Sequence, residues 1–341
     1  MKTIKLNTLI LMFVAVTGIK AQDFHLAQYD VASLYLNPAL TGMYANEDDA
    51  QYKVYVDSRS QWRALGMKPF FTTYLGFDMP YKVQDKKIGL GAYFINNRTG
   101  PGNFNTTGFM VSGAYDILNT KAYTEHLLTT GLQLGLFYKS FNSDRLNYDV
   151  QYSPSTGGGA FDQNITSGED EANRLSITRF DANFGLFYKY VDILESYHPF
   201  VGFSMSHLSM PNESFVGERK RLPIKFMING GCDFKVNEEI ELTPRFIYMN
   251  QAKANEINAG IIGTYKITGN DTKALLGFDY RHKDAVIIHA GIKIDSYSLR
   301  FSYDINTSYL KNYTRSRGAW ELTLVVTGFK GKPVFKTVPK F

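Results

Sequence analysis

Apolar and polar residues alternate along most of this chain. Between residues 128 and 138 the even positions are mostly leucine, whereas the odd positions carry threonine, glycine and glutamine. The same alternation recurs at 286–294, 297–305 and 320–326. Because successive side chains of a strand point to opposite faces, such a run predicts a β-strand with one apolar and one polar face. We find about fourteen such runs, at 51–62, 69–80, 87–98, 103–116, 126–141, 175–191, 197–208, 220–236, 239–250, 256–267, 272–281, 284–294, 296–306 and 317–328.

The links between these runs differ in length in a regular way. Counted from the first run, every second link is short, while the other set contains the long polar links 142–174, 209–219 and 307–316. Short turns at one end and long loops at the other are typical of an outer-membrane β-barrel, with the long loops outside the cell. A soluble sandwich is the alternative, but nothing in a sandwich sorts its loops in this way. Pro244 interrupts the run 239–250 and indicates a bulge or a misplaced boundary there.

Composition agrees with a β protein that crosses a membrane by strands. The chain has 341 residues, of which 15% are aromatic, and 29 are glycine. Mean hydropathy is −0.22, and no apolar run of 18 residues follows the N-terminal leader, which excludes a helical membrane protein. The net charge of +5 is spread over both signs and gives no clustered basic face, so we expect no nucleic-acid binding. The predicted fold is therefore an all-β transmembrane outer-membrane barrel of about 14 antiparallel strands.

The first 21 residues have the pattern of a secretory signal peptide. Lys2 and Lys5 form a basic start, residues 9–16 an apolar core, and Ala21 a small residue at the expected cleavage point. A transmembrane anchor is the alternative, but the apolar core is too short to cross a bilayer of about 30 Å. We therefore expect export to the outer membrane of a Gram-negative bacterium. The single cysteine, Cys232, rules out an intramolecular disulfide and is expected to pack as a small hydrophobe.

Residues 22–50 precede the first strand and are expected to form a hatch inside the barrel. The segment SLYLNPALTG places four large apolar residues around a tight turn made by Asn37, Pro38 and Ala39, with Gly42 after it. Polar and charged residues of both signs fill the inward face of the predicted strands, and a lumen enclosed by fourteen strands needs a partial plug. A solvated periplasmic arm is the alternative, although such an arm has no need of these apolar residues. The expected organisation is signal peptide 1–21, hatch 22–50, barrel 51–328 and periplasmic tail 329–341.

Four segments carry a family resemblance. They are QDFHLAQYDVASLYLNPALTG, RSQW at 59–62, KIGLGAYFINNRTGP at 87–101, and SYDINTSYLKNYTRSRGAWELTLV at 302–325. Together they resemble the PorP/SprF family of the Bacteroidetes type IX secretion system, with Arg59, Ser60, Gln61, Trp62, Arg317 and Gly318 as motif residues. The resemblance implies an outer-membrane barrel that works with other secretion and gliding components and with a secreted surface adhesin or effector. The Asn-Pro-Ala turn also resembles that of FadL-like barrels, whose N-terminal hatch precedes fourteen strands.

Sequence signatures of chemistry are weak. The six histidines form no HExxH pair, and none lies beside a cysteine or carboxylate at metal-ligand spacing. No nucleophile elbow is present, and the glycine triplet at 157–159 lacks the ending of a phosphate-binding loop. We expect no enzyme, no cofactor and no metal. Two functions stay open: a non-enzymatic secretion component, and a FadL-like channel for a small or apolar solute, which the many charges of the lumen disfavour.

The C-terminal tail, residues 329–341, follows the last strand. By the order of the links that strand ends in the periplasm, so the tail is expected there. It carries four lysines and Phe335. We predict that Lys330, Lys332 and Lys336 guide a periplasmic partner to the tail and that Phe335 fills a pocket on that partner. A frayed terminus is the alternative.

Overall fold

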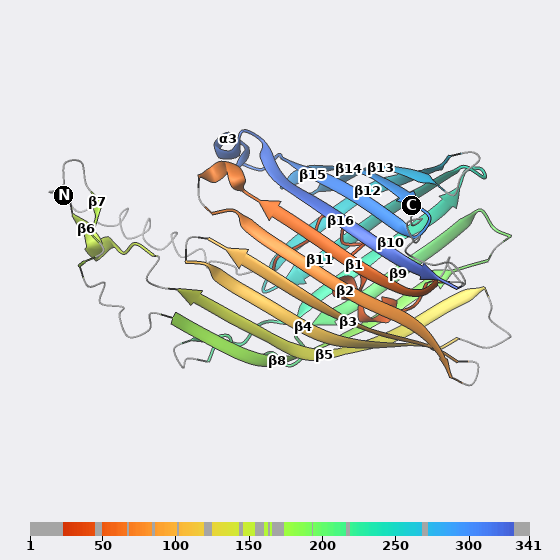
Figure 1. The fold of residues 1–341 in the computed structure, drawn as a ribbon, viewed down its shortest axis with the longest axis horizontal. Helices are drawn as coiled ribbons and strands as arrows, with labels where there is room; N and C mark the ends of the chain where they lie inside the picture. Colours follow the sequence, from red (N-terminus) through yellow and green to blue (C-terminus); the bar gives the residue numbers. More distant parts are fainter. Residues whose placement is uncertain are drawn as a thin grey trace, which may run out of the picture.

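The computed structural model shows a closed, all-antiparallel β-barrel of fourteen strands (Figure 1). The structure describes residues 23–330 except 45–49, 67, 84–85, 101, 119–124, 143–145, 154–159, 163, 166–173, 193, 216–218 and 268–271. The predicted signal peptide and the tail beyond Lys330 lie outside the described residues. In this part of the chain, no helix has the length and apolar content needed to cross a membrane. The predicted fold class and the number of strands are confirmed.

Neighbouring strands of the barrel follow one another in sequence, and the last strand pairs with the first to close it. The barrel strands are β1 (Ala50–Gln61), β2 (Phe70–Val83), β3 (Lys86–Thr99), β4 (Phe104–Asp116), β5 (His126–Asn142), β8 (Arg174–Tyr190), β9 (Tyr197–Ser206), β10 (Lys225–Lys235), β11 (Ile240–Gln251), β12 (Ala254–Lys266), β13 (Lys273–Arg281), β14 (Ala285–Ile294), β15 (Tyr297–Asn306) and β16 (Arg317–Phe329). Each corresponds to one predicted run. The largest difference in a boundary is at β10, which begins at residue 225 and not at 220.

Short elements occupy the hatch and the loops. They are α2 (Ser33–Leu36) and η1 (Pro38–Leu40) in the hatch, η2 (Arg63–Leu65) between β1 and β2, η4 (Asp149–Gln151) with the hairpin β6 (Tyr152–Ser153) and β7 (Ala160–Phe161) between β5 and β8, and α3 (Lys311–Thr314) between β15 and β16. The β6–β7 hairpin lies within the long polar link 142–174.

Pro244 lies inside β11 and marks neither a bulge nor a boundary. It pairs with Ile261 of β12 in an unbroken register. On the other side, pairing with β10 stops at Gly231–Arg245 and resumes at Phe234–Leu242 in the same register. The proline therefore removes local hydrogen bonds without shifting the strands, because its ring nitrogen has no proton to donate.

The two faces of the barrel wall match the alternation of the sequence. On β5, Leu134 is 46% exposed on the outside, whereas its neighbour Gln133 is 1% exposed inside. On β14, Ile288 is exposed and His289 is buried. The outer face is thus apolar and suited to lipid, and the inner face holds the polar and charged side chains.

We expect Leu134→Arg to destabilise the barrel by about 2–4 kcal/mol, because it places a charge on the lipid face near mid-membrane. Thr106→Arg is a suitable control, since Thr106 lines the hollow interior and can accept a long polar side chain. Gln133→Arg is not a neutral comparison, because Gln133 donates a hydrogen bond to the Leu34 carbonyl of the hatch at 2.7 Å. Urea unfolding in lipid vesicles measures the difference, and equal losses for the Leu134 and Thr106 variants would contradict the assignment of the faces.

Candidate functional site

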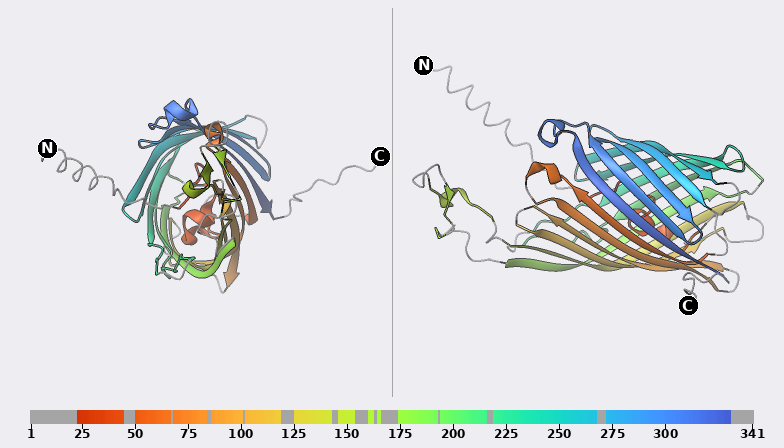
Figure 2. Two further views of the ribbon diagram at one scale, coloured as in Figure 1. Left: turned by 90° about the vertical axis from the view of Figure 1, so that its left-hand side faces the viewer. Right: turned by 45° about the horizontal axis from the view of Figure 1, so that its top comes forward.

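The described part of the hatch, residues 23–44, lies inside the barrel (Figure 2). Asn37 joins α2 to η1 in an extended conformation, and its side chain accepts a hydrogen bond from the Ala39 N–H at 2.9 Å. Pro38 at the first position of η1 fixes the φ angle that the turn needs. The Thr41 hydroxyl donates to the Pro38 carbonyl at 2.8 Å. The sequence NPALT therefore specifies a compact turn by local hydrogen bonds alone.

This turn packs against a row of small residues that crosses the inner wall of the barrel. The row runs through five neighbouring strands in register and consists of Gly89, Ala114, Gly131, Gly185 and Ser204. A Cβ atom added at Gly131 would overlap the Pro38 carbonyl group, and one at Gly185 would overlap the Asn37 side chain. The missing side chains thus let the hatch backbone touch the wall.

Hydrogen bonds fix the turn on the row. Asn37 donates to the carbonyls of Leu186 at 2.9 Å and Phe203 at 3.3 Å. The Thr129 hydroxyl donates to the Ala39 carbonyl at 2.7 Å, and the Gly42 N–H donates to Asp78 at 2.8 Å. Asn37 and Thr41 are fully buried. These contacts are those of a docked plug, and a solvated arm does not account for them.

The first half of the hatch is tied to the seam where β1 meets β16. Arg59 is fully buried and forms ion pairs with Asp304 at 2.7 Å and Glu321 at 3.0 Å. Glu321 also accepts hydrogen bonds from the backbone N–H groups of Ala27 at 2.8 Å and Gln28 at 2.7 Å. This seam network joins three of the segments that carry the family resemblance, although 245 residues separate Arg59 from Asp304.

The other motif residues have different environments. Ser60 is buried beside the network, and Gln61 faces the hollow interior. Trp62 has a positive φ of 58° and packs against Phe70 with ring centroids 4.5 Å apart. Gly318 lies where a Cβ would come within 2.6 Å of the Asp304 carbonyl oxygen, so glycine is required beside the network. Arg317 is exposed at the loop.

A second charged group joins the hatch to the wall through Asp30. Its carboxylate pairs with Arg245 at 2.7 Å and Arg300 at 2.6 Å, and Arg245 also binds the buried Asp279. Burial opposes ionisation of Asp30, but the two guanidinium groups outweigh it and hold the pKa of this carboxyl below its usual range. The sequence showed charges of both signs on the inward face, but it did not show that the hatch supplies a partner.

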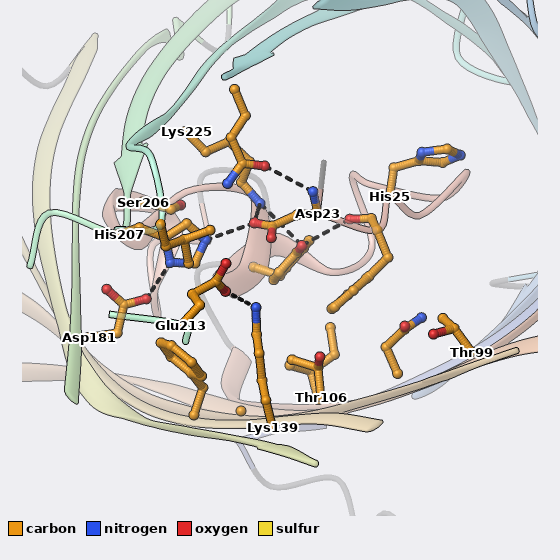
Figure 3. A pocket seen from close by; sticks show the side chains of 18 of the residues that line it. Asp23, His25, Thr99, Thr106, Lys139, Asp181, Ser206, His207, Glu213 and Lys225 are labelled. Atoms are coloured by element: carbon orange, nitrogen blue, oxygen red, sulfur yellow. Dashed lines mark hydrogen bonds and ion pairs between the residues drawn. The ribbon is translucent and has the colours of Figure 1, made fainter. Parts of the chain in front are cut away.

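A cavity of about 510 Å³ lies beside the hatch, at the barrel end that carries the long links (Figure 3). We call it the chamber. Its floor includes Asp23 and Tyr35 of the hatch, and the described part of the β9–β10 loop contributes Glu213 and Leu222. His207, directly after β9, bridges Asp23 at 2.7 Å and Asp181 at 2.5 Å. Sequence reasoning missed this cluster, because no local spacing connects the three residues.

The charge of His207 depends on its two carboxylate neighbours. Burial opposes its protonation, but Asp23 and Asp181 outweigh burial and raise the pKa of His207 from 6.5 to about 9. A histidine whose pKa is raised on folding stabilises the protein fully below its ordinary pKa and loses this effect as the pH rises through the folded value. The bridge from the hatch to β8 is therefore expected to weaken in alkaline solution.

We expect wild type to be more heat-stable than His207→Gln at pH 6, and the difference in Tm to shrink as the pH passes through about 9. Thermal unfolding of both proteins in detergent between pH 6 and 10 measures this. His282→Gln is the control, because His282 is exposed at the β13–β14 turn. A Tm difference that stays constant with pH would show that His207 acts only by packing.

The predicted partner-docking residues of the tail are not brought into this site. Lys330 is exposed at the end of β16, and Lys332, Phe335 and Lys336 lie outside the described residues. Docking of the tail therefore stays a prediction. Within the described ranges, no group of three or more histidine, cysteine, aspartate or glutamate side chains is arranged to hold a metal ion.

The sequence model of a family described as "Type IX secretion system membrane protein PorP/SprF" matches residues 19–326. The chain belongs to the PorP/SprF family. This membership and the barrel place the protein in the outer membrane as a membrane component of the type IX secretion system. The seam network and the hatch side of the docked turn are thus made by residues of the segments that carry the family resemblance.

Solved structures of similar fold are outer-membrane channels. A deletion mutant of the monoaromatic hydrocarbon channel TodX is 12% identical, with a TM-score of 0.49, over 87% of this chain and 93% of that chain. The Ralstonia pickettii toluene transporter TbuX is 11% identical, with a TM-score of 0.48, over 87% and 92%. The Pseudomonas putida toluene transporter TodX is 11% identical, with a TM-score of 0.45, over 89% and 94%. No curated protein sequence matches the chain.

Proposed function

We propose that this PorP/SprF protein is a non-enzymatic part of the type IX secretion machine that supports export or surface attachment of a large adhesin or effector. It acts by protein–protein contacts with that client and with other secretion or gliding components. We further propose that the protein reaches the outer membrane by its signal peptide, in a member of the Bacteroidetes. The observation that carries the proposal is the docked hatch within a chain of this family.

The contacts that hold the hatch in place favour a scaffolding role for the protein over the role of an open channel. The turn at Asn37 is fixed by wall carbonyls, and the first half of the hatch is fixed by Glu321 and Asp30. Releasing the hatch would break several buried hydrogen bonds and ion pairs at once, each with a net contribution of about 0.5–1.5 kcal/mol, or more where a charged group takes part. A closed barrel can still present loops and turns to partners on both sides of the membrane.

A FadL-like channel for a small or apolar solute is the second candidate, and the chamber is the observation that favours it. The chamber has aromatic and aliphatic walls that include Tyr93, Ile95, Met110 and Phe137. Buried ion pairs line the same space, however, and an apolar solute would strip water from them. The secretion role is therefore preferred.

Deletion of the gene, with complementation, tests the two candidates. We expect loss of one or more proteins from the cell surface, and their return when the wild-type gene is restored. Toluene uptake, measured in the same strains, should not change. An unchanged surface proteome together with reduced toluene uptake would favour the channel and contradict the secretion role.

A further inference from the structure

The hatch forms part of the lining of the chamber. The hatch turn and the residue before it contact β3, β4, β5, β8 and β9, so they lie across the interior of the barrel. The chamber's lining residues Trp62, Phe70, Thr99 and Phe104 come from the ends of strands at the side of the long links. Long links of such barrels face the cell exterior. A ligand that enters from outside therefore meets the docked hatch.

One wall of the chamber is suited to an aromatic or aliphatic side chain. Tyr93, Ile95, Met110 and Phe137 come from β3, β4 and β5 and are all buried. Trp62 and Phe70 add an aromatic pair nearer the end of the strands. Aromatic rings gain from offset or edge-to-face contact with other rings as well as from burial.

The chamber also carries balanced charges, and one of them, Lys139, lies next to the aromatic wall, with its Nζ 5.2 Å from the centroid of the Phe137 ring. Lys139 pairs with Glu213, and Lys225 pairs with Asp23 at 3.1 Å. His207 lies between Asp23 and Asp181 (Figure 3). With His207 protonated, three cations face three carboxylates, so the chamber has no net charge with which to attract a phosphate or another small anion.

These ion pairs also disfavour a hydrocarbon ligand. The side chains of Asp23, Lys139 and Glu213 keep part of their surface accessible from the chamber, at 18%, 13% and 25%. An apolar molecule that filled the space would remove their water and give no hydrogen bond in return. A polypeptide brings its own N–H and C=O groups, which can replace that water while a side chain packs on the aromatic wall.

We propose that the chamber binds a polypeptide segment bearing an aromatic side chain, and that the exported client of the secretion machine supplies this segment. The inference rests on the proposed function, because it takes its ligand from the client. The segment enters from the cell exterior, places its aromatic ring against Phe137 and Tyr93, and forms hydrogen bonds with the accessible groups of Asp23, Lys139 and Glu213.

A cysteine placed in the chamber tests this directly. In a Cys232→Ser background, Thr106→Cys puts a thiol beside Lys139, the residue opposite it on β5. Val111→Cys on the same strand is the matched control, since Val111 is 55% exposed on the lipid face. The client is the protein that disappears from the surface when the gene is deleted. Intact cells are treated with a membrane-impermeant maleimide in strains with and without that client.

We expect the Thr106→Cys thiol to react in cells lacking the client and to be protected severalfold in cells that make it, while the Val111→Cys thiol stays unreactive in both. Equal reaction with and without the client would overturn the chamber proposal, even where gene deletion removes the client and so supports the secretion role. Protection by added toluene or by free tyrosine in cells lacking the client would also overturn it, in favour of a small-molecule site.

Filling the chamber gives an independent measurement. Thr106→Trp should reduce surface display of the client severalfold, whereas Val111→Trp should leave it unchanged. Heat-resistant mobility on gels shows whether each variant has folded as a barrel. A folded Thr106→Trp barrel with normal display of the client would contradict the proposal.

Discussion

Arg59→Leu is expected to destabilise the folded protein by about 3–5 kcal/mol, the largest effect of any single substitution in the seam network. Arg59 is buried between Asp304 and Glu321 at the closing pair of strands. Its removal leaves Glu321 without its cation in a site that water does not reach, while Asp304 keeps only Arg281. Urea unfolding of the purified barrel in lipid vesicles measures the loss.

The control for this prediction is Arg63→Leu, directly after the RSQW motif. Arg63 is exposed, and its guanidinium carbon lies 5.9 Å from the centroid of the Trp320 ring, so its loss should cost less than about 1 kcal/mol. A double variant, Arg59→Leu with Glu321→Gln, should be less destabilised than the sum of the two single variants, because it removes both members of the pair. Simple additivity would show that the two side chains are not coupled. If Arg59→Leu does not assemble, its amount in the outer membrane gives the same comparison.

The strands of the barrel could be predicted from the sequence because their signal is local. Leu134 and Gln133 are neighbours with opposite polarity, and this alternation is repeated on each strand. The order of short and long links then indicated how the strands are oriented. Neither prediction requires knowledge of which residues contact one another across the barrel.

The seam network could not be predicted in the same way. Arg59 and Asp304 meet because β1 pairs with β16 in one particular register. A shift of that register by one residue would turn Glu321 to the lipid face, so the partners depend on closure of the whole sheet. The His207 cluster is similar, since it joins the hatch, β8 and the end of β9.

The inner wall contains several glycines, and the sequence does not show which of them contact the hatch. The polar face was rich in glycine, yet Gly108 on β4 and Gly131 on β5, which both belong to this face, look alike in the sequence. The structure separates them. A Cβ at Gly108 would meet only the Ile95 side chain, at 3.1 Å, whereas one at Gly131 would overlap the hatch backbone.

Gly131→Leu is therefore expected to undock the hatch turn and let ions through the barrel. The new side chain collides with the backbone of Pro38 and Ala39, which cannot move aside as a flexible side chain could. Moving the turn breaks the hydrogen bonds made by Thr129 and Asn37, at about 1 kcal/mol each. Loss of three such bonds raises the undocked fraction about a hundredfold. Single-channel recording in planar bilayers should show conducting steps that are absent from wild type.

Gly113→Leu is the matched control, because it adds the same side chain to the lipid face of the neighbouring strand, where leucine is favoured. Both variants should keep heat-resistant mobility on gels, since neither changes the pairing of the strands. Conductance from the Gly131 variant alone would show that the small-residue row holds the plug in place. Conductance from neither variant would show that the seam network and Asp30 keep the hatch docked without the turn, and equal conductance from both would place the leak in the wall itself.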